Sequence, residues 1–394
     1  MKKIGFVTPW YGRNITGGAE AELRGLTDHL KNEGVELEIL TTCVQSFSSD
    51  WNINFYKPGE YEEEGIVVKR FKIRKRDAKG FDRINAKFIQ HSPVTDAEAD
   101  LFLKEMINSD DLYEYMRENQ NEYDLFVFIP YMFGTTYYGA QVCPQKTVLI
   151  PCFHDEPYIY IKSFKDVFSK IAGIVYNALP EKELANRVFN LKNVKQGVFG
   201  LGMDTDIHAD PRRFRKKYGL DDESFILYAG RKDCGKNVDT LIKYFCEYKR
   251  RNDVRLKLIL IGGGEIEIPD MCKNDILDLG FVDKQDKYDA YAAAEMLCQP
   301  SKNESFSIVI MESWLCKRPV LVHEMCEVTK SFVIQTNGGL YFDSYFEFEG
   351  AVNYILSHPD VALQMGENGC AFVNDNFSWD KIMEKYIGFF NELI

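Results

Sequence analysis

Two glutamates eight positions apart have the residue type and spacing to bind one ligand between them. Glu304 precedes an apolar segment with helical character, and Glu312 lies within it. A helical rise of 1.5 Å per residue could spread their carboxylates over ~12 Å, which suits sugar hydroxyls at one end and ribose hydroxyls at the other. A diphosphate between them would face the amides of Ser305, Phe306 and Ser307 at the positive end of the helix dipole. The alternative is a capped, buried helix whose glutamates lie on its solvated side.

A pair of cations follows a different predicted strand. Arg231 and Lys236 lie in the loop after the strand that ends at Gly230. Arginine binds a diphosphate as a fork and lysine as a point charge, and both would stabilise the negative charge on a departing nucleoside diphosphate. On its own such a pair usually means two exposed cations near a turn. Its combination with the two glutamates favours a nucleotide-sugar site.

Metal and cofactor motifs are weaker. Asp204 and Asp206 imitate an Asp-x-Asp metal site, but they lie where one predicted domain passes into the next, and we assign them no metal. Residues 262–264 are three glycines whose spacing does not fit a dinucleotide-binding loop. The ten cysteines include no Cys-x-x-Cys pair, so we interpret them as small core residues without zinc or disulfides. We therefore predict that the protein needs no metal and no cofactor.

Alternating strands and helices are expected to position these residues. In the first half, apolar runs typical of buried parallel strands occur at 4–7, 36–40, 66–68, 125–129, 148–150, 174–176 and 194–199. The pattern begins again in the second half, at 225–230, 256–261, 276–282, 296–298 and 319–322. Leu23, Leu26 and Leu30 recur at helical spacing ahead of Gly34, which predicts the first helix and its end. The chain is thus expected to be an α/β protein with two parallel sheets covered by helices.

The length of the chain and a break in its strand–helix pattern predict two domains. A chain of 394 residues is too long for one ordinary core. The periodicity breaks at the two glycines within residues 200–204, shortly before Pro211. We therefore expect a first domain over residues 1–200, a second over residues 201–376 and a last helix over residues 377–394.

Taken together, these segments resemble the C-terminal domain of retaining nucleotide-sugar glycosyltransferases of family 4, in the glycogen synthase/mannosyltransferase-like group. The residues that carry this match are Arg231, Lys236, Gly280, Phe281, Val282, Pro300, Ser301, Glu304 and Glu312. Residues 17–20 (Gly-Gly-Ala-Glu) resemble the first glycine loop of the family, and residues 339–342, 365–366 and 377–379 resemble its closing segment. The resemblance covers nearly the whole chain. It implies the GT-B fold, in which two Rossmann-like domains face a central cleft and the last helix crosses back onto the first domain.

The resemblance also implies a role for each matching residue. Glu304 would hold hydroxyls of the transferred sugar and Glu312 those of the ribose, while Arg231 and Lys236 would bind the diphosphate. His154 would lie beside the reacting sugar, so His154 and Glu304 are the expected catalytic residues. The other expected substrate contacts are Gly17, Gly18, Ser305, Phe306, Ser307 and the backbone near Phe281 and Val282. Many relatives have glycine where this chain has Ser305 and Ser307, and the serine hydroxyls could add hydrogen bonds to phosphate.

The function that the resemblance implies is transfer of a hexosyl or deoxyhexosyl group with retention at the anomeric carbon. The donor would be a UDP-, GDP- or dTDP-linked sugar and the acceptor a saccharide, in the synthesis of surface polysaccharide or another glycoconjugate. Two alternatives keep the fold: a sugar phosphorylase or nucleotide-sugar epimerase, and a non-catalytic sugar-binding protein. A nicotinamide-dependent dehydrogenase is disfavoured because no Gly-x-Gly-x-x-Gly follows the first predicted strand.

The charge distribution predicts where the protein acts. A net charge of -12 argues against a nucleic-acid partner. No apolar run reaches the roughly 20 residues of a membrane-spanning helix, so we expect a cytoplasmic protein. Residues 69–87 nevertheless hold nine lysines and arginines against two aspartates. With Phe71, Ile73, Phe81 and Phe88 between them, these cations predict peripheral contact with an anionic membrane and a lipid-linked acceptor. The alternative is a solvated loop beside a soluble acceptor.

Overall fold

The structure is a computed structural model that describes residues 3–15, 17–220 and 223–394. It consists of two compact units, which we describe separately. The first unit holds residues 1–202 together with 382–394, and the second holds residues 203–381. The last helix therefore ends within the first unit.

The first unit is built on an eight-stranded sheet in the order β3-β4-β2-β1-β5-β6-β7-β8. Its strands are β1 Ile4–Thr8, β2 Leu37–Thr42, β3 Gly59–Glu63, β4 Ile66–Phe71, β5 Leu125–Phe128, β6 Thr147–Leu149, β7 Gly173–Tyr176 and β8 Lys195–Val198. Every neighbouring pair is parallel except β3 and β4, and β1 lies centrally, with Ile4 opposite both Leu37 and Leu125. β1, β2 and β5 are buried along their whole length, because apolar runs in a parallel sheet are covered on both faces.

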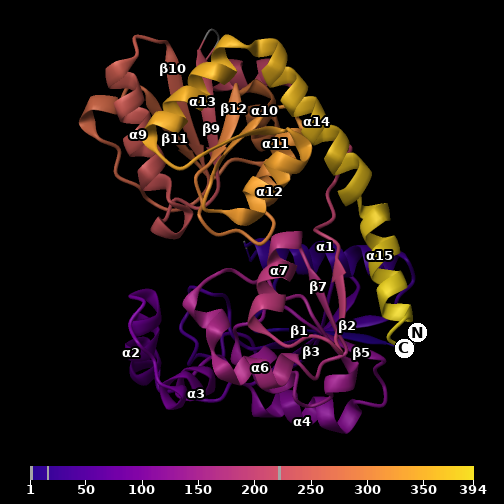
Figure 1. Ribbon diagram of the computed structural model, residues 1–394. Helices are drawn as coiled ribbons and strands as arrows, with labels where there is room; N and C mark the ends of the chain where they lie inside the picture. The colour runs from indigo at the N-terminus through magenta and orange to yellow at the C-terminus, as the bar shows by residue number, and fades with distance from the viewer. Residues whose placement is uncertain (1–2, 16, 221–222) are drawn as a thin grey trace. The chain divides into compact units, whose positions relative to one another are not determined.

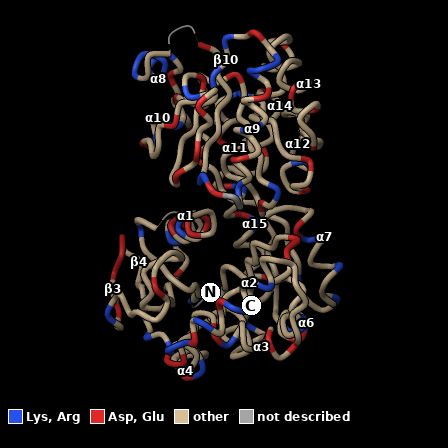
Figure 2. Tube along the Cα trace, turned by 90° about the vertical axis from the view of Figure 1, so that its left-hand side faces the viewer, with Lys and Arg blue, Asp and Glu red and all other residues tan. Residues whose placement is uncertain are grey.

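The antiparallel edge strand β3 is a finding that the sequence did not predict. It joins β4 through a two-residue turn at Glu64 and Gly65, whose φ angles of 53° and 74° are those of the primed turns that close hairpins. The strand has the sequence Gly-Glu-Tyr-Glu-Glu and is exposed over most of its length, so no apolar run marks it. The glutamates of this strand colour the tube red at the label β3 in Figure 2.

Helices cover both faces of this first sheet (Figure 1). They are α1 Gly18–Asn32, α2 Ala78–Ile89, α3 Asp96–Lys104, α4 Asp110–Asn119, α5 Gly134–Gly139, α6 Lys162–Phe168, α7 Leu179–Val188 and α15 Trp379–Asn391, with the 3-10 turns η1 Pro144–Lys146 and η2 Pro157–Tyr160. In α1 the predicted leucines Leu23, Leu26 and Leu30 are all buried, and Gly34 follows the helix with a φ of 80°. Here the helical spacing predicted the buried face correctly.

The basic segment of residues 69–87 differs from the sequence-based expectation. Ile73, Phe81 and Phe88 are buried in the hydrophobic core, and Phe71 packs against that core. These apolar groups are therefore not available to a membrane, and this part of the prediction was wrong. The reason is that β4 and α2 each turn their apolar face inward, which a run of mixed residues does not reveal.

Internal partners engage five of the nine cations in this segment. They are Lys69 with Glu38, Arg70 with Glu63, Arg74 with Asp110, Lys87 with Glu98, and Arg76 stacked on Trp51 and Phe81. Lys72, Lys75, Lys79 and Arg83 are exposed. The segment thus presents a smaller positive charge to solvent than its composition indicates.

The second unit is built on a six-stranded, wholly parallel sheet in the order β11-β10-β9-β12-β13-β14. Its strands are β9 Ser224–Ala229, β10 Leu256–Ile261, β11 Ile276–Gly280, β12 Met296–Gln299, β13 Val320–His323 and β14 Gly339–Phe342. Its helices are α8 Pro211–Tyr218, α9 Val238–Arg251, α10 Lys284–Ala293, α11 Ile308–Leu315, α12 Glu327–Thr336, α13 Tyr345–Ser357 and α14 Pro359–Phe377, with the turns η3 Cys234–Lys236 and η4 Asp270–Cys272. Both units thus have the α/β architecture that the sequence predicts.

The edge strand β14 was not predicted as a strand. It begins with Gly339, where a Cβ atom would lie 2.0 Å from the carbonyl oxygen of Val320 on the neighbouring strand. Because the strand has only four residues and begins with glycine, the sequence gives little indication of it. Nine of the ten cysteines are described in full, and all nine are free; the side chain of Cys234 lies outside the described part.

Candidate functional site

The predicted ligand-binding residues of the second unit lie in loops beyond the carboxyl ends of its strands. Arg231 and Lys236 follow β9, and Glu304 follows β12. These two strands are neighbours in the sheet. Since parallel strands end at one edge, the structure brings these loops together as open α/β sheets do at their binding sites.

Lys236 and Glu304 form an ion pair. The Lys236 ammonium donates to Glu304 Oε1 at 2.7 Å, and Gln299 Nε2 lies 3.4 Å from the same oxygen. Only 11% of the Glu304 side chain is exposed, so the carboxylate is held between these two donors. Asn237, which has a left-handed backbone, donates its amide to the carbonyl of Pro300 at 3.0 Å and ties the two loops to each other.

Arg231 lies apart from this pair. Its side chain is 65% exposed, and its Nε is 3.3 Å from a carboxylate oxygen of Asp233. The Tyr228 hydroxyl donates to the Arg231 carbonyl at 2.5 Å, which fixes the backbone but leaves the guanidinium at the surface. The Asp233 carboxylate also accepts from the Lys236 backbone amide at 3.0 Å, so Asp233 joins the two residues, while the Lys236 ammonium points to Glu304 instead.

The glycine run at residues 262–264 explains how the loops approach so closely. A Cβ atom on Gly262 would lie 2.0 Å from the carbonyl oxygen of Gly230, and one on Gly264 would lie 2.8 Å from the carbonyl oxygen of Lys232. The Lys232 amide donates to the carbonyl of Gly263 at 2.7 Å. Both Gly262 and Gly264 have positive φ angles, 123° and 96°, so no other residue fits easily. These glycines allow the backbone of this run to lie in direct contact with the backbone of the loop after β9.

An exposed aromatic ring stands beside this glycine run. The Phe281 side chain is 75% exposed, and a Cβ atom on Gly263 would lie 2.6 Å from the tip of its ring. The ring therefore rests on the glycine backbone and shows its other surface to solvent. Val282 follows at intermediate burial. The pair offers an apolar surface next to the loops that carry the cations.

The start of α11 differs from the predicted geometry. The helix begins at Ile308, so Glu304 lies in the preceding loop, and the estimate of a ~12 Å separation along one helix axis does not apply. Ser307 caps the helix in a left-handed conformation, φ 72° and ψ 76°, that non-glycine residues rarely adopt. Its hydroxyl oxygen is buried and has no hydrogen-bond partner among the described residues. Ser305 lies two residues earlier at intermediate burial.

Phe306 has a structural part in this loop. Its side chain is 2% exposed, and its ring packs against Phe332 and Phe377 at centroid distances of 5.5 and 5.0 Å. Any contact of Phe306 with a ligand would therefore come from its backbone. The buried ring anchors the loop that carries Glu304.

Glu312 is buried on α11 and is bound by two residues of α10. Lys287 forms an ion pair with its Oε1, and the Tyr291 hydroxyl donates to its Oε2 at 2.9 Å. Burial, together with the nearby Glu312, raises the pKa of Tyr291 well above its usual value, so the hydroxyl keeps its proton. Sequence reasoning missed Lys287 and Tyr291, although a spacing of four residues places them on one face of a helix.

The predicted glycine loop of the first unit lies at the start of α1. A Cβ atom on Gly17 would lie 1.9 Å from a carboxylate oxygen of Glu20, so glycine lets that side chain fold back. Glu20 in turn accepts a hydrogen bond of 2.7 Å from the Trp10 indole. Gly18 has open space around it, and Thr16 lies outside the described residues.

His154 lies in the loop after β6, and its side chain is 31% exposed. Its Nδ1 is 3.9 Å from a carboxylate oxygen of Glu156. The Phe153 backbone amide donates to Glu181 at 2.7 Å, and this bond holds the backbone of the loop in place. The other oxygen of Glu181 accepts from the Asn177 amide at 2.6 Å, so one carboxyl holds the loops after β6 and β7.

Two buried carboxyls, Glu22 and Glu181, lie beneath this loop and were not predicted. Asn177 Nδ2 donates to Glu22 at 3.1 Å, and the Cys152 thiol lies 3.7 Å from the same oxygen. Burial raises the pKa of Glu22 and the pKa of Glu181 to about 8, although the hydrogen bonds that each carboxyl accepts lower it. Both therefore hold a proton near neutral pH. Through them α1 is joined to the loop that carries His154.

Asp204 and Asp206 lie in the second unit with different surroundings. Asp204 accepts from Lys284 at 2.9 Å and from the Trp379 indole at 3.2 Å. The Asp206 side chain is 92% exposed and lies 3.5 Å from His208. Within the described ranges no three His, Cys, Asp or Glu side chains form a cluster that could hold a metal ion. Metal independence stays a prediction.

Comparison with known proteins finds similar sequences in glycosyltransferases. Residues 210–371, most of the second unit, match the family described as "Glycosyl transferases group 1". The alpha-D-kanosaminyltransferase of Streptomyces kanamyceticus is 26% identical over 219 residues, which are 53% of this chain and 55% of the relative. The D-inositol 3-phosphate glycosyltransferase of Gordonia bronchialis is 24% identical over 249 residues, 58% and 54% of the two chains. The chain thus spans about half the length of the curated relatives it matches.

Solved structures define the fold over the whole chain. The sucrose-phosphate synthase of Thermosynechococcus elongatus superposes with a TM-score of 0.72 at 16% identity, over 100% of this chain and 99% of the other. The Anabaena HepE protein in complex with UDP gives a TM-score of 0.73 at 15% identity, over 100% of both chains. The predicted GT-B fold is confirmed, and the match to glycosyl transferases group 1 covers residues 210–371 of it. In the described part of the chain, no helix is both long and apolar enough to cross a bilayer.

Proposed function

We propose that this protein transfers a hexosyl or deoxyhexosyl group from a nucleotide-sugar donor to a saccharide acceptor. The observation that carries the proposal is the pairing of Glu304 and Glu312, each with a lysine, in a domain that matches glycosyl transferases group 1. The relatives named above are a kanosaminyltransferase and an inositol-phosphate glycosyltransferase. Structures of HepE hold UDP and UDP-glucose. These names support a nucleotide-linked donor.

The chemistry of the second unit suits such a donor. The exposed Phe281 ring offers a surface for a base, and Glu312 offers buried carboxylate oxygens for ribose hydroxyls. Lys236 and Arg231 would bind the diphosphate and stabilise the charge that builds as it leaves. Lys236 can do so because its ammonium carries three donors and Glu304 uses one of them. Glu304 would then accept hydrogen bonds from the hydroxyls of the transferred sugar.

We further propose that transfer retains the anomeric configuration and needs no metal. In this mechanism the departing phosphate takes the proton of the acceptor hydroxyl on the same face of the sugar, and the C–O bond to phosphate breaks as the new C–O bond forms. His154, held by the anchored loop after β6, would contact the reacting sugar. The lysine and arginine would supply the charge stabilisation that a metal gives in other enzymes.

Donor binding can be tested first by thermal shift with UDP-, GDP-, dTDP- and ADP-linked sugars. A ligand at 100 times its Kd should stabilise the protein by about 2.7 kcal/mol. Release of nucleoside diphosphate in the presence of acceptor, retained in EDTA, would then support transfer, and the NMR coupling of the new anomeric proton would report the configuration. If no nucleotide sugar stabilises the protein, the proposal fails. Epimer or sugar phosphate formed from donor alone would favour an epimerase or a phosphorylase instead.

We also propose that the acceptor is lipid-linked and that the protein meets the cytoplasmic face of a membrane to reach it. The support comes from residues other than those first expected. Phe47, Ile53 and Phe55 are each at least 55% exposed in the loop after β2. The same loop bonds to the basic segment, since Asn54 accepts from the Ile73 amide at 2.9 Å. Lys72 and Lys75 lie close to Ile73 in the chain and are exposed, so exposed apolar groups and exposed cations occur on two segments that are hydrogen-bonded to each other.

Vesicle flotation can test this contact. Wild-type protein should float with phosphatidylserine vesicles at low salt and much less with phosphatidylcholine vesicles. Phe47→Ser with Phe55→Ser should weaken binding at all salt concentrations, and Lys72→Glu with Lys75→Glu should remove its dependence on anionic lipid. Flotation that is absent, or equal in wild type and both variants, would contradict the proposal.

A further inference from the structure

A cavity of about 550 Å³ lies in the first unit, away from every residue assigned above. Pro144 lies on its wall just before β6, and Lys170 lies on its wall just before β7. The cavity is therefore at the amino edge of these strands, whereas His154 follows the carboxyl end of β6. Its volume is within the ~300–1,000 Å³ of small-molecule sites.

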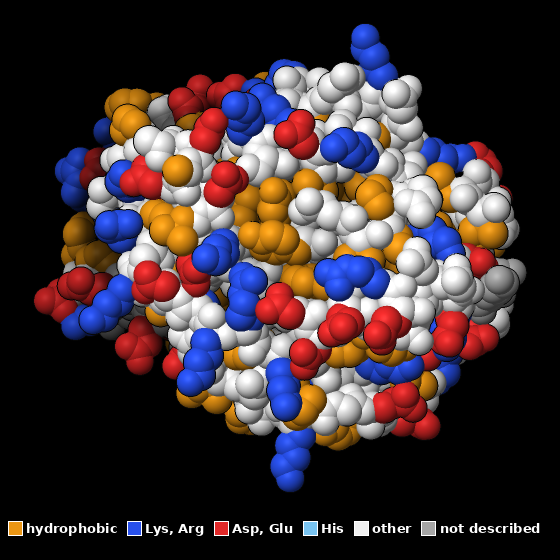
Figure 3. Space-filling model, turned by 90° about the horizontal axis from the view of Figure 1, so that it is seen from below, with side chains coloured by type: hydrophobic (Ala, Val, Ile, Leu, Met, Phe, Trp, Pro, Cys, Tyr) orange, Lys and Arg blue, Asp and Glu red, His pale blue; other side chains and the backbone are white. Residues whose placement is uncertain are grey.

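The surface around this region is mixed in character. α3 and α6, which supply part of the wall, lie low in Figure 1. In the view from below, hydrophobic side chains gather near the middle of the face, and Lys, Arg, Asp and Glu side chains surround them (Figure 3). Neither sign of charge dominates there.

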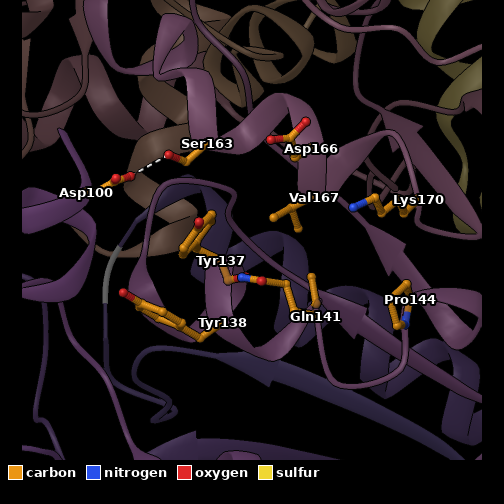
Figure 4. A pocket seen from close by; sticks show the side chains of 10 residues that line it. Asp100, Tyr137, Tyr138, Gln141, Pro144, Ser163, Asp166, Val167 and Lys170 are labelled. Atoms are coloured by element: carbon orange, nitrogen blue, oxygen red, sulfur yellow. Dashed lines mark hydrogen bonds between the residues drawn. The ribbon is translucent and has the colours of Figure 1, made fainter. Parts of the chain in front are cut away.

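Two tyrosines form one side of the cavity. Tyr137 and Tyr138, both half-buried on α5, stand edge to face with ring centroids 4.9 Å apart and planes at 76°. Gln141 lies just after the end of α5, and Asp166, Val167 and Lys170 stand opposite (Figure 4). The cavity thus has an aromatic corner facing a polar wall.

Several polar groups on this wall still have hydrogen-bonding capacity. Asp100 accepts from the Ser163 hydroxyl at 2.5 Å and keeps its second oxygen. Gln141 donates to the Tyr137 carbonyl at 2.8 Å and keeps its own oxygen. Within the described ranges, the Asp166 carboxylate and the Lys170 ammonium have neither a hydrogen-bond partner nor an ion-pair partner. The cavity therefore offers both donors and acceptors to a ligand.

The aromatic, acidic and basic groups of the cavity together favour one class of ligand over others. Two carboxylates disfavour an anion, and the Lys170 ammonium disfavours a cation that the tyrosines and carboxylates could otherwise hold. A neutral ring with several hydroxyls can donate to Asp166, accept from Lys170 and lay its C–H groups on an aromatic face. We propose that this cavity is a second saccharide-binding site, which holds one or two sugar units at a distance from the donor loops.

The role of such a site rests on the proposed function, but its existence does not. In a glycosyltransferase it would retain a remote part of a long acceptor and raise the local concentration of the end to be extended. Loss of the site should therefore weaken the use of long acceptors and leave short ones unaffected. Saccharide binding itself can be measured without any turnover.

The test uses the full chain, saturated with UDP, and a panel of maltose, cellobiose, lactose and N,N′-diacetylchitobiose in saturation-transfer NMR. Asp166→Ala and Gln141→Ala are suitable variants because both residues are exposed in the structure. Lys165→Ala, on the same α6 but outside the cavity lining, is the matched control. All three should keep the wild-type thermal midpoint.

We expect at least one disaccharide to receive saturation from wild type and from the control, and at least a fivefold weaker signal from both cavity variants. Signal that is equal in all four proteins would place the saccharide elsewhere and overturn the inference. So would the absence of signal from every disaccharide, or displacement of a bound one by choline or spermidine. Binding without any nucleotide-sugar turnover would leave this site standing and refute the proposed function.

Discussion

The two units use buried glutamates in opposite ways. In the second unit Glu304 and Glu312 each meet a lysine, so the carboxylates are paired with charge. In the first unit Glu22 and Glu181 have a nitrogen or sulfur neighbour but no cation among the described residues, and burial raises the pKa of both. An ion pair can open to admit a charged or polyhydroxylated substrate. A buried carboxyl that accepts from backbone or side-chain groups of neighbouring loops is better suited to hold those loops in place.

This contrast predicts that Glu181 matters most for stability. Glu181→Ala should lower the free energy of unfolding by about 3 kcal/mol, because the buried amides of Phe153 and Asn177 lose their acceptor. Urea titration measures the change. Glu183→Ala, two residues away and exposed, is the control and should change little. A small loss in Glu181→Ala would mean that the carboxyl does not hold the loops.

The next largest effect is expected on turnover in the second unit. Lys236→Ala should reduce kcat/KM for the nucleotide sugar about 100-fold, since it removes a preorganised cation from the leaving group. Initial-rate kinetics at saturating acceptor measures it. Lys243→Ala, at an exposed lysine of α9 that pairs with Asp239, should keep the wild-type rate. Equal rates in both variants would show that the ion pair with Glu304 is structural.

The neutral carboxyls also predict a pH dependence of stability. The folded state keeps the Glu22 proton up to about pH 8, whereas the unfolded chain releases it near pH 4.5, so the folded state binds more protons between these values. The free energy of unfolding should therefore fall by about 2 kcal/mol or more as the pH rises from 5 to 8. Glu22→Gln should reduce this slope, as measured by urea titration at several pH values. A slope that is unchanged in the variant would show that Glu22 is ionised in the folded protein.

Arg231 should give the smallest of these effects. Arg231→Ala should lower kcat/KM about tenfold, near 1.4 kcal/mol, because its exposed guanidinium is more screened by solvent than Lys236. Arg251→Ala, on the surface of α9, serves as a comparison. The loss in Arg231→Ala should shrink as salt rises. A loss as large as that of Lys236→Ala would mean that Arg231 moves into the site when donor binds.

The sequence predicted the strands that carry apolar runs, and it missed two of the four edge strands, β3 and β14, which are short and polar or begin with glycine. It also predicted the loops that carry Arg231, Lys236 and Glu304, because chemistry-bearing residues follow strand ends in α/β proteins. Partners such as Lys287 and Tyr291 were missed, because their spacing shows a shared helix face but not that this face packs against Glu312. The buried pair Glu22 and Glu181 was missed for the same reason, because their burial depends on how α1 and α7 pack.

The exposed strand β3 has a consequence for handling the protein. It lies at the edge of the eight-stranded sheet, and Glu60, Glu62 and Glu63 lie along it. A free strand edge is a template on which another chain can pair, and like charges on two such edges keep them apart. Dissolved salt screens this repulsion between exposed charges. High salt should therefore promote aggregation through β3, and storage at low ionic strength should delay it.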